Sequence, residues 1–213
     1  MSISSALRKL YTRFNYLRTV PVYLCVKHSP HRQLIEMDLY RWWEICIGSM
    51  TEMGESDKID KKHELAAWNW LLLNKMEFRS LLQHRLRKPP KSIVSVLHFA
   101  VSRILWKPLD SLYIDCNEIG GGLFIQHGFA TIISAQRIGE NCWINQQVTI
   151  GYSGLDCPVL EDNVTVHCGA KVIGGITMHR NSTAGAGAVV VKDVPENAVV
   201  VGVPAKILKY KAQ

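Results

Sequence analysis

The sequence predicts a helical N-terminal half followed by an all-β parallel helix built from six-residue units. Apolar residues recur in the second half at a constant spacing of six, at Leu160, Val166, Val172, Met178, Ala184 and Val190. The same spacing runs earlier through Ile132, Ile138, Ile144 and Ile150. Because this period fits neither an α-helix nor simple strand alternation, each unit should form one short strand and one turn. Stacked units then bury the recurring residues in one apolar column.

Charge divides the 213 residues into two predicted domains, 1–110 and 111–213. The first holds eighteen Lys and Arg against ten Asp and Glu, and the second holds seven against eight, so the net charge of +7 belongs to the first. A basic surface could meet nucleic acid, an anionic membrane or a phosphorylated substrate. No zinc-ligand spacing or nucleic-acid module accompanies the charge, so we expect no nucleic-acid partner.

Helical periodicity extends from Ser4 to about Trp106. Residues 50–62 are polar and charged, which indicates a loop or an exposed helix start. A strong helix is predicted from about 62 to 88, and Pro89 and Pro90 should end it because proline cannot continue a helix.

An apolar helix is predicted over 93–106, with Lys88, Lys91, Arg103 and Lys107 around it. It is too short to span a bilayer, which needs about 20 apolar residues. Packing on the β-helix or on a neighbouring subunit is the favoured interpretation. The alternative is a helix that lies on a membrane surface, with its basic residues on anionic head groups.

The six cysteines contain no CxxC pair and no framework spacing, which favours reduced thiols in the cytosol. The N-terminal basic residues alternate with aromatic residues, and the apolar run 20–26 is interrupted by Pro21. This pattern is not that of a signal peptide, so we expect a cytoplasmic protein.

The β-helix is predicted to begin near Ile114 and to end near Val194, with one break in its rhythm. Ile150 and Leu160 are ten residues apart where six are expected, so residues 152–158 should bulge out as a loop. Loops that interrupt a rigid solenoid tend to cluster on its binding face.

Three stretches resemble the serine O-acetyltransferase branch of the hexapeptide acyltransferases. They are GLFIQHG at 122–128, IGENCWINQQVTIG at 138–151, and GAGAVVVKDVP at 185–195 followed by VGVPAK at 201–206. The resemblance covers about residues 112–210. It implies a left-handed β-helix that assembles as a homotrimer, with acetyl-CoA as the co-substrate and with sites between subunits that acylate a hydroxyl group.

The resemblance also implies that His127, in the turn with Gln126, is the general base. A hydroxyl is a poor nucleophile at neutral pH, and imidazole is suited to take its proton. The family's orienting aspartate aligns on Leu112. Asp110 and Asp115 lie nearby but out of register, and we take Asp115 as the candidate partner of His127.

The Arg-His pair with which the family grips an amino-acid carboxylate falls here on Asp156-Cys157, in a shorter loop. A carboxylate at this position would disfavour a free amino acid, because like charges repel when they are brought together. A neutral saccharide is therefore the expected acceptor. Hydrogen-bonding and stacking groups for it are Gln126, Trp143, Gln146, Tyr152 and Asp156. Trp143 and Tyr152 could equally be packing residues.

For acetyl-CoA, the resemblance implies main-chain contacts along the groove between coils, with basic residues near the phosphates. The matching positions are Gly151, Cys168, Gly169, Ala186 and Gly187, with Lys192 and Lys206 near the phosphates. The Gly151 N–H could stabilise negative charge on the thioester oxygen. His127 and His167 are too far apart for a zinc motif, so we expect no metal.

The sequence thus predicts an acetyl-CoA-dependent O-acetyltransferase that acts on a saccharide in surface polysaccharide biosynthesis. A lipid-linked acceptor would place the protein at the inner face of the membrane. One alternative is serine O-acetyltransferase of cysteine biosynthesis. Another, from a different class, is a non-catalytic trimeric scaffold.

Overall fold

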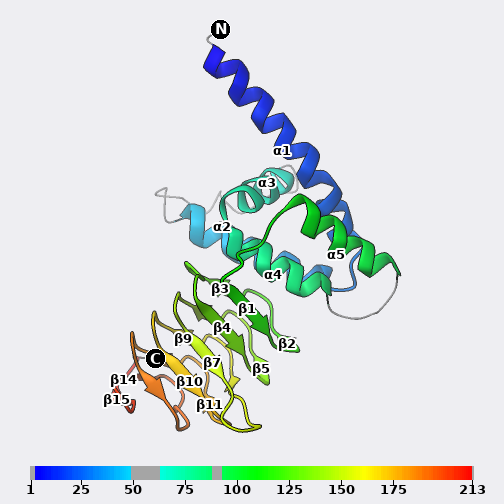
Figure 1. Ribbon diagram of the computed structural model, residues 1–213. Helices are drawn as coiled ribbons and strands as arrows, with labels where there is room; N and C mark the ends of the chain where they lie inside the picture. Colours follow the sequence, from blue (N-terminus) through cyan, green and yellow to red (C-terminus); the bar gives the residue numbers. More distant parts are fainter. Residues whose placement is uncertain (1–2, 49–62, 88–92, 213) are drawn as a thin grey trace. The chain divides into compact units, whose positions relative to one another are not determined.

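The computed structural model describes residues 3–48, 63–87 and 93–212. Lys88, Lys91 and the segment 50–62 discussed above lie outside the described residues. The chain forms two compact units, Met1–Pro108 and Leu109–Gln213. The first is helical and the second is a left-handed parallel β-helix, as the sequence predicts (Figure 1).

The helical unit contains five helices in its described part. They are α1 (Ile3–Lys27), α2 (Arg32–Gly48), α3 (Glu64–Asn74), α4 (Met76–Arg87) and α5 (Ile93–Leu105). An aromatic cluster forms the centre of this unit, because Phe78 meets both Trp42 and Trp68 with ring centroids 5.5 and 5.6 Å apart. All three side chains are buried.

The continuous helix predicted over 62–88 is wrong, because the chain breaks between α3 and α4. Lys75 adopts an extended conformation with φ of −124°. A helix end leaves carbonyl groups without intrahelical partners. Arg79 satisfies two of them, since its guanidinium donates to the carbonyls of Leu72 at 2.6 Å and Leu73 at 2.9 Å. The side chain of Asn74 also donates to the carbonyl of Trp70 at 2.8 Å.

A buried ion pair joins α2 to α4. Arg85 donates from Nε to Asp38 Oδ2 at 3.0 Å and from Nη2 to Asp38 Oδ1 at 3.2 Å, and both side chains are almost fully buried. Burying one of these charges alone would be unfavourable, so each side chain needs the other.

Three sheets form the β-helix, and every strand pair is parallel except the last. Sheet A contains β1 (Leu112–Asp115), β4 (Thr131–Ser134), β7 (Thr149–Gly151), β10 (Lys171–Ile173) and β13 (Val189–Val190). Sheet B contains β2 (Glu118–Ile119), β5 (Arg137–Ile138), β8 (Val159–Leu160) and β11 (Thr177–Met178). Sheet C contains β3 (Phe124–Ile125), β6 (Trp143–Ile144), β9 (Thr165–Val166), β12 (Thr183–Ala184), β14 (Ala198–Val201) and the antiparallel β15 (Lys206–Tyr210).

The apolar column is confirmed from Ile138 to Val190, where every predicted position is buried, but the prediction is wrong at Ile132. Ile132 is 45% exposed, and its neighbour Ile133 is fully buried and pairs with Ile150. The reason is a longer turn, because Ile125 and Ile133 are eight residues apart instead of six. The extra residues move the inward position by one.

Turns between the sheets stack into three corners of the solenoid. The first corner joins sheet A to sheet B and includes the loop 152–158. The second joins sheet B to sheet C. The third joins sheet C to sheet A through the turns 126–130, 145–148, 167–170 and 185–188.

All six cysteines lie in the described part of the chain and none forms a disulfide. No helix that the structure describes combines the length and apolar content needed to cross a bilayer.

We predict that Asp38→Asn destabilises the helical unit by about 3–5 kcal/mol, because it removes the carboxylate that forms an ion pair with the buried Arg85 guanidinium. Tryptophan fluorescence during urea unfolding measures this, since five of the six tryptophans belong to this unit and only Trp143 to the β-helix. Arg32→Gln is the matched control, because it removes a more exposed ion pair with Glu36 and should cost less than about 1 kcal/mol. Similar losses for both variants would contradict the prediction.

Candidate functional site

His127 lies in the lengthened turn of the third corner. Its φ of 52° is left-handed, as is the φ of 50° at Ala130. The lower coils have one left-handed residue in the corresponding turns, at Gln147, Gly169 and Gly187. His127 is therefore an additional left-handed position, and such backbone conformations in residues other than glycine cluster at functional sites. Its side chain is exposed and makes no hydrogen bond or ion pair with any described residue.

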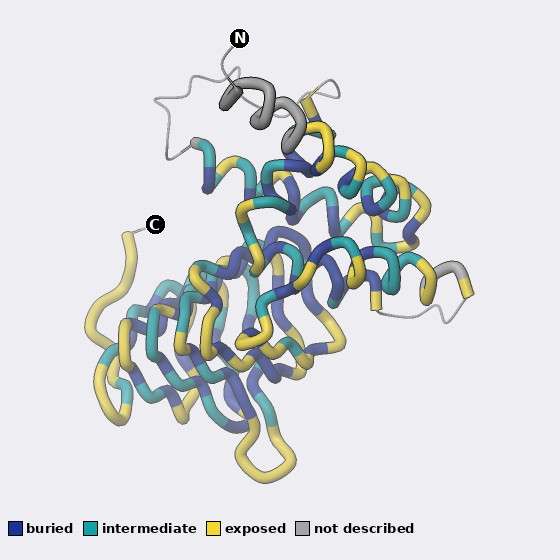
Figure 2. The backbone as a smooth tube through the Cα atoms, turned by 45° about the horizontal axis from the view of Figure 1, so that its top comes forward, coloured by how far each residue is buried: buried dark blue, intermediate teal, exposed yellow. Residues whose placement is uncertain are grey.

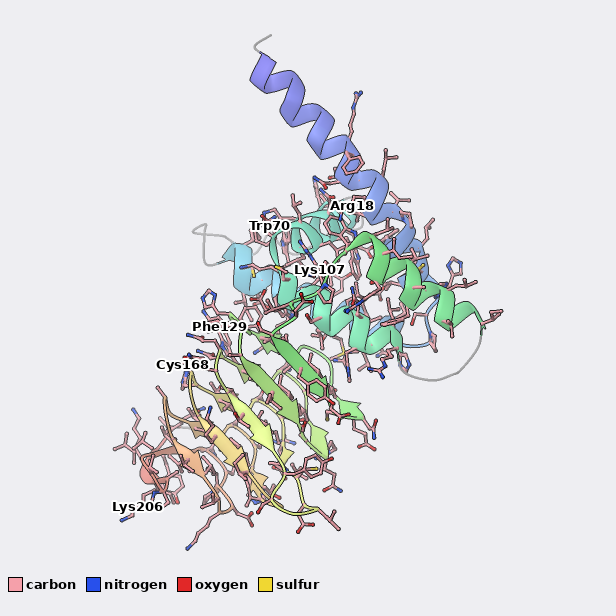
Figure 3. All side chains as sticks on the ribbon, in the orientation of Figure 1. Arg18, Trp70, Lys107, Phe129, Cys168 and Lys206 are labelled. Carbon is pink, nitrogen blue, oxygen red and sulfur yellow. The ribbon has the colours of Figure 1, made fainter. Side chains whose placement is uncertain are left out.

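Main-chain hydrogen bonds stack the turns of the third corner in register. Gln126 N donates to Ile144 O at 2.8 Å, and His167 N donates to Ala184 O at 2.9 Å. Figure 3 shows Phe129, Cys168 and Lys206 following one another down one edge of the solenoid. This edge gathers the predicted site residues Gln126, His127, Gln146, Cys168, Gly169, Ala186 and Gly187.

Trp143 holds the side chain of Gln126 beside His127. Its indole N–H donates to Gln126 Oε1 at 3.2 Å. The Trp143 ring packs edge-on against the buried Phe124, with centroids 4.7 Å apart. These contacts favour the packing interpretation of Trp143.

Gln146 has a side-chain oxygen that is buried and accepts no hydrogen bond from the described residues. Its main-chain carbonyl is occupied, because it accepts from Gly169 N at 3.1 Å. A buried acceptor without a donor is unfavourable by about 1–3 kcal/mol. A bound molecule that donates a hydrogen bond here would remove that penalty.

The first corner carries the loop 152–158, which bulges out as the sequence predicts (Figure 2). Ser153 and Asp156 close it, with Ser153 N donating to Asp156 O at 2.9 Å and Asp156 N to Ser153 O at 3.3 Å. Asp156 is exposed and Leu155 is 95% exposed at the tip. Tyr152 is exposed at the base of the loop.

Tyr152 also forms a small cluster with Cys157 and Asp115. A side-chain hydrogen bond with Cys157 raises the pKa of the Tyr152 phenol, and the electrostatic effect of the nearby Asp115 acts in the same direction. The phenol therefore stays protonated at neutral pH and can donate a hydrogen bond.

Asp115 does not lie beside His127 within one chain. It ends β1 at the first corner, whereas His127 precedes β4 at the third corner. These corners are separated by a four-residue strand, about 13 Å at the usual rise. Asp110 is better placed, because Leu112 pairs with Thr131 and Thr131 N donates to Ser111 O at 3.1 Å. This register puts Asp110 at the corner that carries His127.

The residues expected around acetyl-CoA also divide between two corners. Gly151 ends β7 at the first corner, and the exposed Lys192 follows β13 there. Ala186 and Gly187 are exposed at the third corner, where main-chain groups are accessible. Lys206 follows the last turn of the third corner, which Ala205 N closes by donating to Val189 O at 2.8 Å. Among the described residues, the third corner combines exposed main-chain groups at Ala186 and Gly187 with the cation of Lys206.

Lys171 was missed by the sequence analysis. Its Nζ donates to Gln147 O at 2.8 Å, so a further cation lies at the third corner. Its position could have been inferred from the sequence, because Lys171 directly follows Ala170, the small residue at the end of a turn. His179 is held by Glu161, with Nδ1 and Oε1 3.3 Å apart. No group of three or more potential metal ligands comes together in the described residues.

No protein-family model matches the chain. It is similar to a serine acetyltransferase of Staphylococcus xylosus, with 38% identity over 135 residues, which cover 61% of this chain and 61% of the relative. It is also similar to a serine acetyltransferase of Synechococcus elongatus, with 43% identity over 96 residues, which cover 43% of this chain and 39% of the relative. The chain thus spans between 39% and 61% of the length of these two relatives.

Solved structures share the fold. A serine acetyltransferase of Neisseria gonorrhoeae superposes with a TM-score of 0.60 at 21% identity, over 95% of this chain and 79% of that one. A Brucella abortus serine acetyltransferase in complex with coenzyme A gives a TM-score of 0.57 at 21% identity, over 89% of this chain and 72% of that one. At these identities the likeness concerns the fold.

We predict that Gly151→Ala leaves the free energy of unfolding nearly unchanged. Gly187→Ala should lower the free energy of unfolding by about 1–2 kcal/mol. A Cβ at Gly151 meets its nearest neighbour, Thr149 Cγ2, at an ordinary 3.8 Å, whereas Gly187 has a left-handed φ of 68°. Thermal unfolding followed by circular dichroism measures both. A large loss of stability in Gly151→Ala would contradict the prediction. It would show that the fold itself requires glycine at this position, so the glycine would not indicate a ligand contact.

Proposed function

We propose that this chain is an acetyl-CoA-dependent O-acetyltransferase in which His127 is the general base. The proposal rests on one observation. His127, in the turn 126–130 of the third corner, has an exposed side chain and a left-handed backbone conformation. The relatives named serine acetyltransferase support the same activity. His127 would take the proton from the acceptor hydroxyl as its oxygen bonds to the thioester carbonyl carbon. It would return that proton to the CoA sulfur as the C–S bond breaks.

The division of the candidate residues between two corners favours a site completed by a second copy. Tyr152, Asp156 and Gly151 lie at the first corner, and His127 lies across sheet A from them. A closed cyclic trimer would bring the first corner of one subunit to the third corner of the next. In that arrangement the Gly151 N–H of a neighbour could face the thioester oxygen.

The orienting carboxylate is Asp110 in this proposal, in place of Asp115. A carboxylate beside the imidazole would hold it in the tautomer that accepts a proton and would stabilise the imidazolium formed. Asp110 shares the corner of His127 within one chain by strand register, whereas Asp115, at the first corner, would approach His127 only from the neighbouring subunit of the trimer.

L-Serine is the first candidate acceptor, because the reported relatives carry that name. This favours the alternative of the sequence analysis over its saccharide reading. One observation keeps a neutral polyhydroxylated acceptor, which could be lipid-linked, as the second candidate. The loop 152–158 contains Asp156 and no Lys, Arg or His. The nearest cation by register is the exposed Arg137, which pairs with Val159 just beyond the loop.

We predict that His127→Asn lowers kcat by about 100-fold to 10,000-fold, the usual range for loss of a general base. Asparagine tolerates the left-handed backbone that this position requires, so the fold should persist. CoA release in a thiol assay measures turnover, and calorimetric titration of CoA measures binding, which should be retained. Turnover within a few-fold of the parent would exclude His127 as the base.

Asp110→Asn and Asp115→Asn are the matched controls. If Asp110 orients the imidazole, its loss should lower kcat and change the pH profile while KM stays near that of the parent. Asp115→Asn should leave the pH profile unchanged. The reverse pattern would return the orienting role to Asp115.

We predict saturable CoA release with L-serine if the first candidate is correct, and Arg137→Gln should then raise the KM for serine while leaving the KM for acetyl-CoA unchanged. Asp156→Asn should lower the KM for serine, because it removes a charge that repels the carboxylate. Saturation only with sugars or polyols would select the second candidate. The protein could also release no CoA above the rate of hydrolysis with serine, sugars or polyols, and fail to bind CoA. That result would favour the non-catalytic scaffold.

A further inference from the structure

The outer surfaces of α1 and α5 are apolar and lack acidic residues. α5 leaves Ile93, Val96, Leu97 and Ile104 exposed, with Leu97 at 57% and Ile104 at 82%. Their spacing of three, one and seven places them along one face of the helix. α1 similarly exposes Phe14, Leu17, Val20 and Leu24. The two helices pack against each other, so both apolar rows belong to one part of the helical unit.

The inner side of α5 is anchored by polar contacts and is not available to a partner. Gln83 Nε2 donates to Trp106 O at 2.7 Å, and Arg103 Nη1 donates to Gln83 Oε1 at 3.2 Å. Ser102 on this side is buried. The helix packs against both α4 and α1, and its apolar row is left uncovered by the described chain.

Charge distinguishes the possible occupants of this surface. α1 and α5 contain no Asp or Glu, and Arg13 is an exposed cation of α1, whereas Lys27 pairs with Glu36 and Glu64 and Arg103 donates to Gln83. Elsewhere in the described helical unit, Glu36 and Glu64 pair with Lys27, and Asp38 pairs with Arg85. The described residues of the helical unit hold thirteen Lys and Arg against five Asp and Glu, so this part of the chain is positively charged.

A second copy of the chain is a poor complement. A two-fold interface brings the same patch of each subunit together. Two copies of a unit with this excess of positive charge would repel each other, and like-charge contacts oppose association. An anionic lipid surface offers both the apolar phase and the negative charge that this face lacks.

We propose that the exposed apolar face of α1 and α5 binds the surface of an anionic bilayer. α5 has thirteen residues, about 20 Å in length, whereas the hydrocarbon core is about 30 Å thick. The helix therefore lies in the head-group region with its aliphatic row toward the acyl chains. The proposal is independent of the acetyltransferase activity.

Sedimentation with vesicles tests this, using the full chain without acetyl-CoA. The protein should pellet with vesicles of phosphatidylserine in phosphatidylcholine at low salt and be released at high salt. The double variant Leu97→Glu/Ile104→Glu should reduce binding to background, and both positions are too exposed for the change to unfold the unit. Replacing the exposed Arg13 by Gln should weaken binding by about fivefold.

Leu155→Glu is the matched control, because Leu155 is a highly exposed leucine in the β-helix and its variant should bind like the parent. Failure to bind anionic vesicles at low salt, or equal binding to pure phosphatidylcholine, would overturn the proposal. The double variant could also show a lower molar mass by light scattering while its vesicle binding is unchanged. This result would overturn the proposal too, because it would show that the face binds a second copy of the chain.

Discussion

The stacking of one coil on the next through main-chain hydrogen bonds is the constraint on which the candidate site depends. Each parallel strand pair sets the height of the turns at both of its ends. Gln126 is held by Ile144 and His167 by Ala184 in this way, at 2.8 and 2.9 Å. His127 thereby obtains a defined place above Gln146 and Cys168, although its side chain makes no hydrogen bond or ion pair with a described residue. A change in strand register would move the whole edge together.

Much of this architecture was readable from the sequence because a solenoid repeats one local rule. The apolar period predicted the column from Ile138 onward, and the break before Leu160 predicted the loop. The prediction for Ile132 was wrong because a six-residue period does not show where a turn contains extra residues. The eight-residue interval between Ile125 and Ile133 was visible, but only main-chain pairing shows which of two adjacent isoleucines faces inward.

The candidate site was partly readable for a related reason. His127, Cys168 and Gly187 occupy motif positions, so they follow one edge as soon as the coils are in register. Asp115 illustrates the limit, because proximity in sequence is no guide to which corner a residue occupies. The helix break at Lys75 was also beyond reach, since it depends on Arg79 bonding to carbonyls from the preceding helix. Such a contact has no periodic signal.

The strand β15 has a consequence for assembly along the solenoid axis. A parallel β-helix exposes unpaired main-chain groups at its last coil, and such an edge is a template on which further strands could add. β15 reverses direction, pairs with β14 and is exposed along its whole length, with Lys206 and Lys209 among its residues. An incoming coil would therefore meet an antiparallel strand with charged side chains on the sheet C side. This arrangement opposes end-to-end fibre growth while leaving the lateral faces open for closed oligomers.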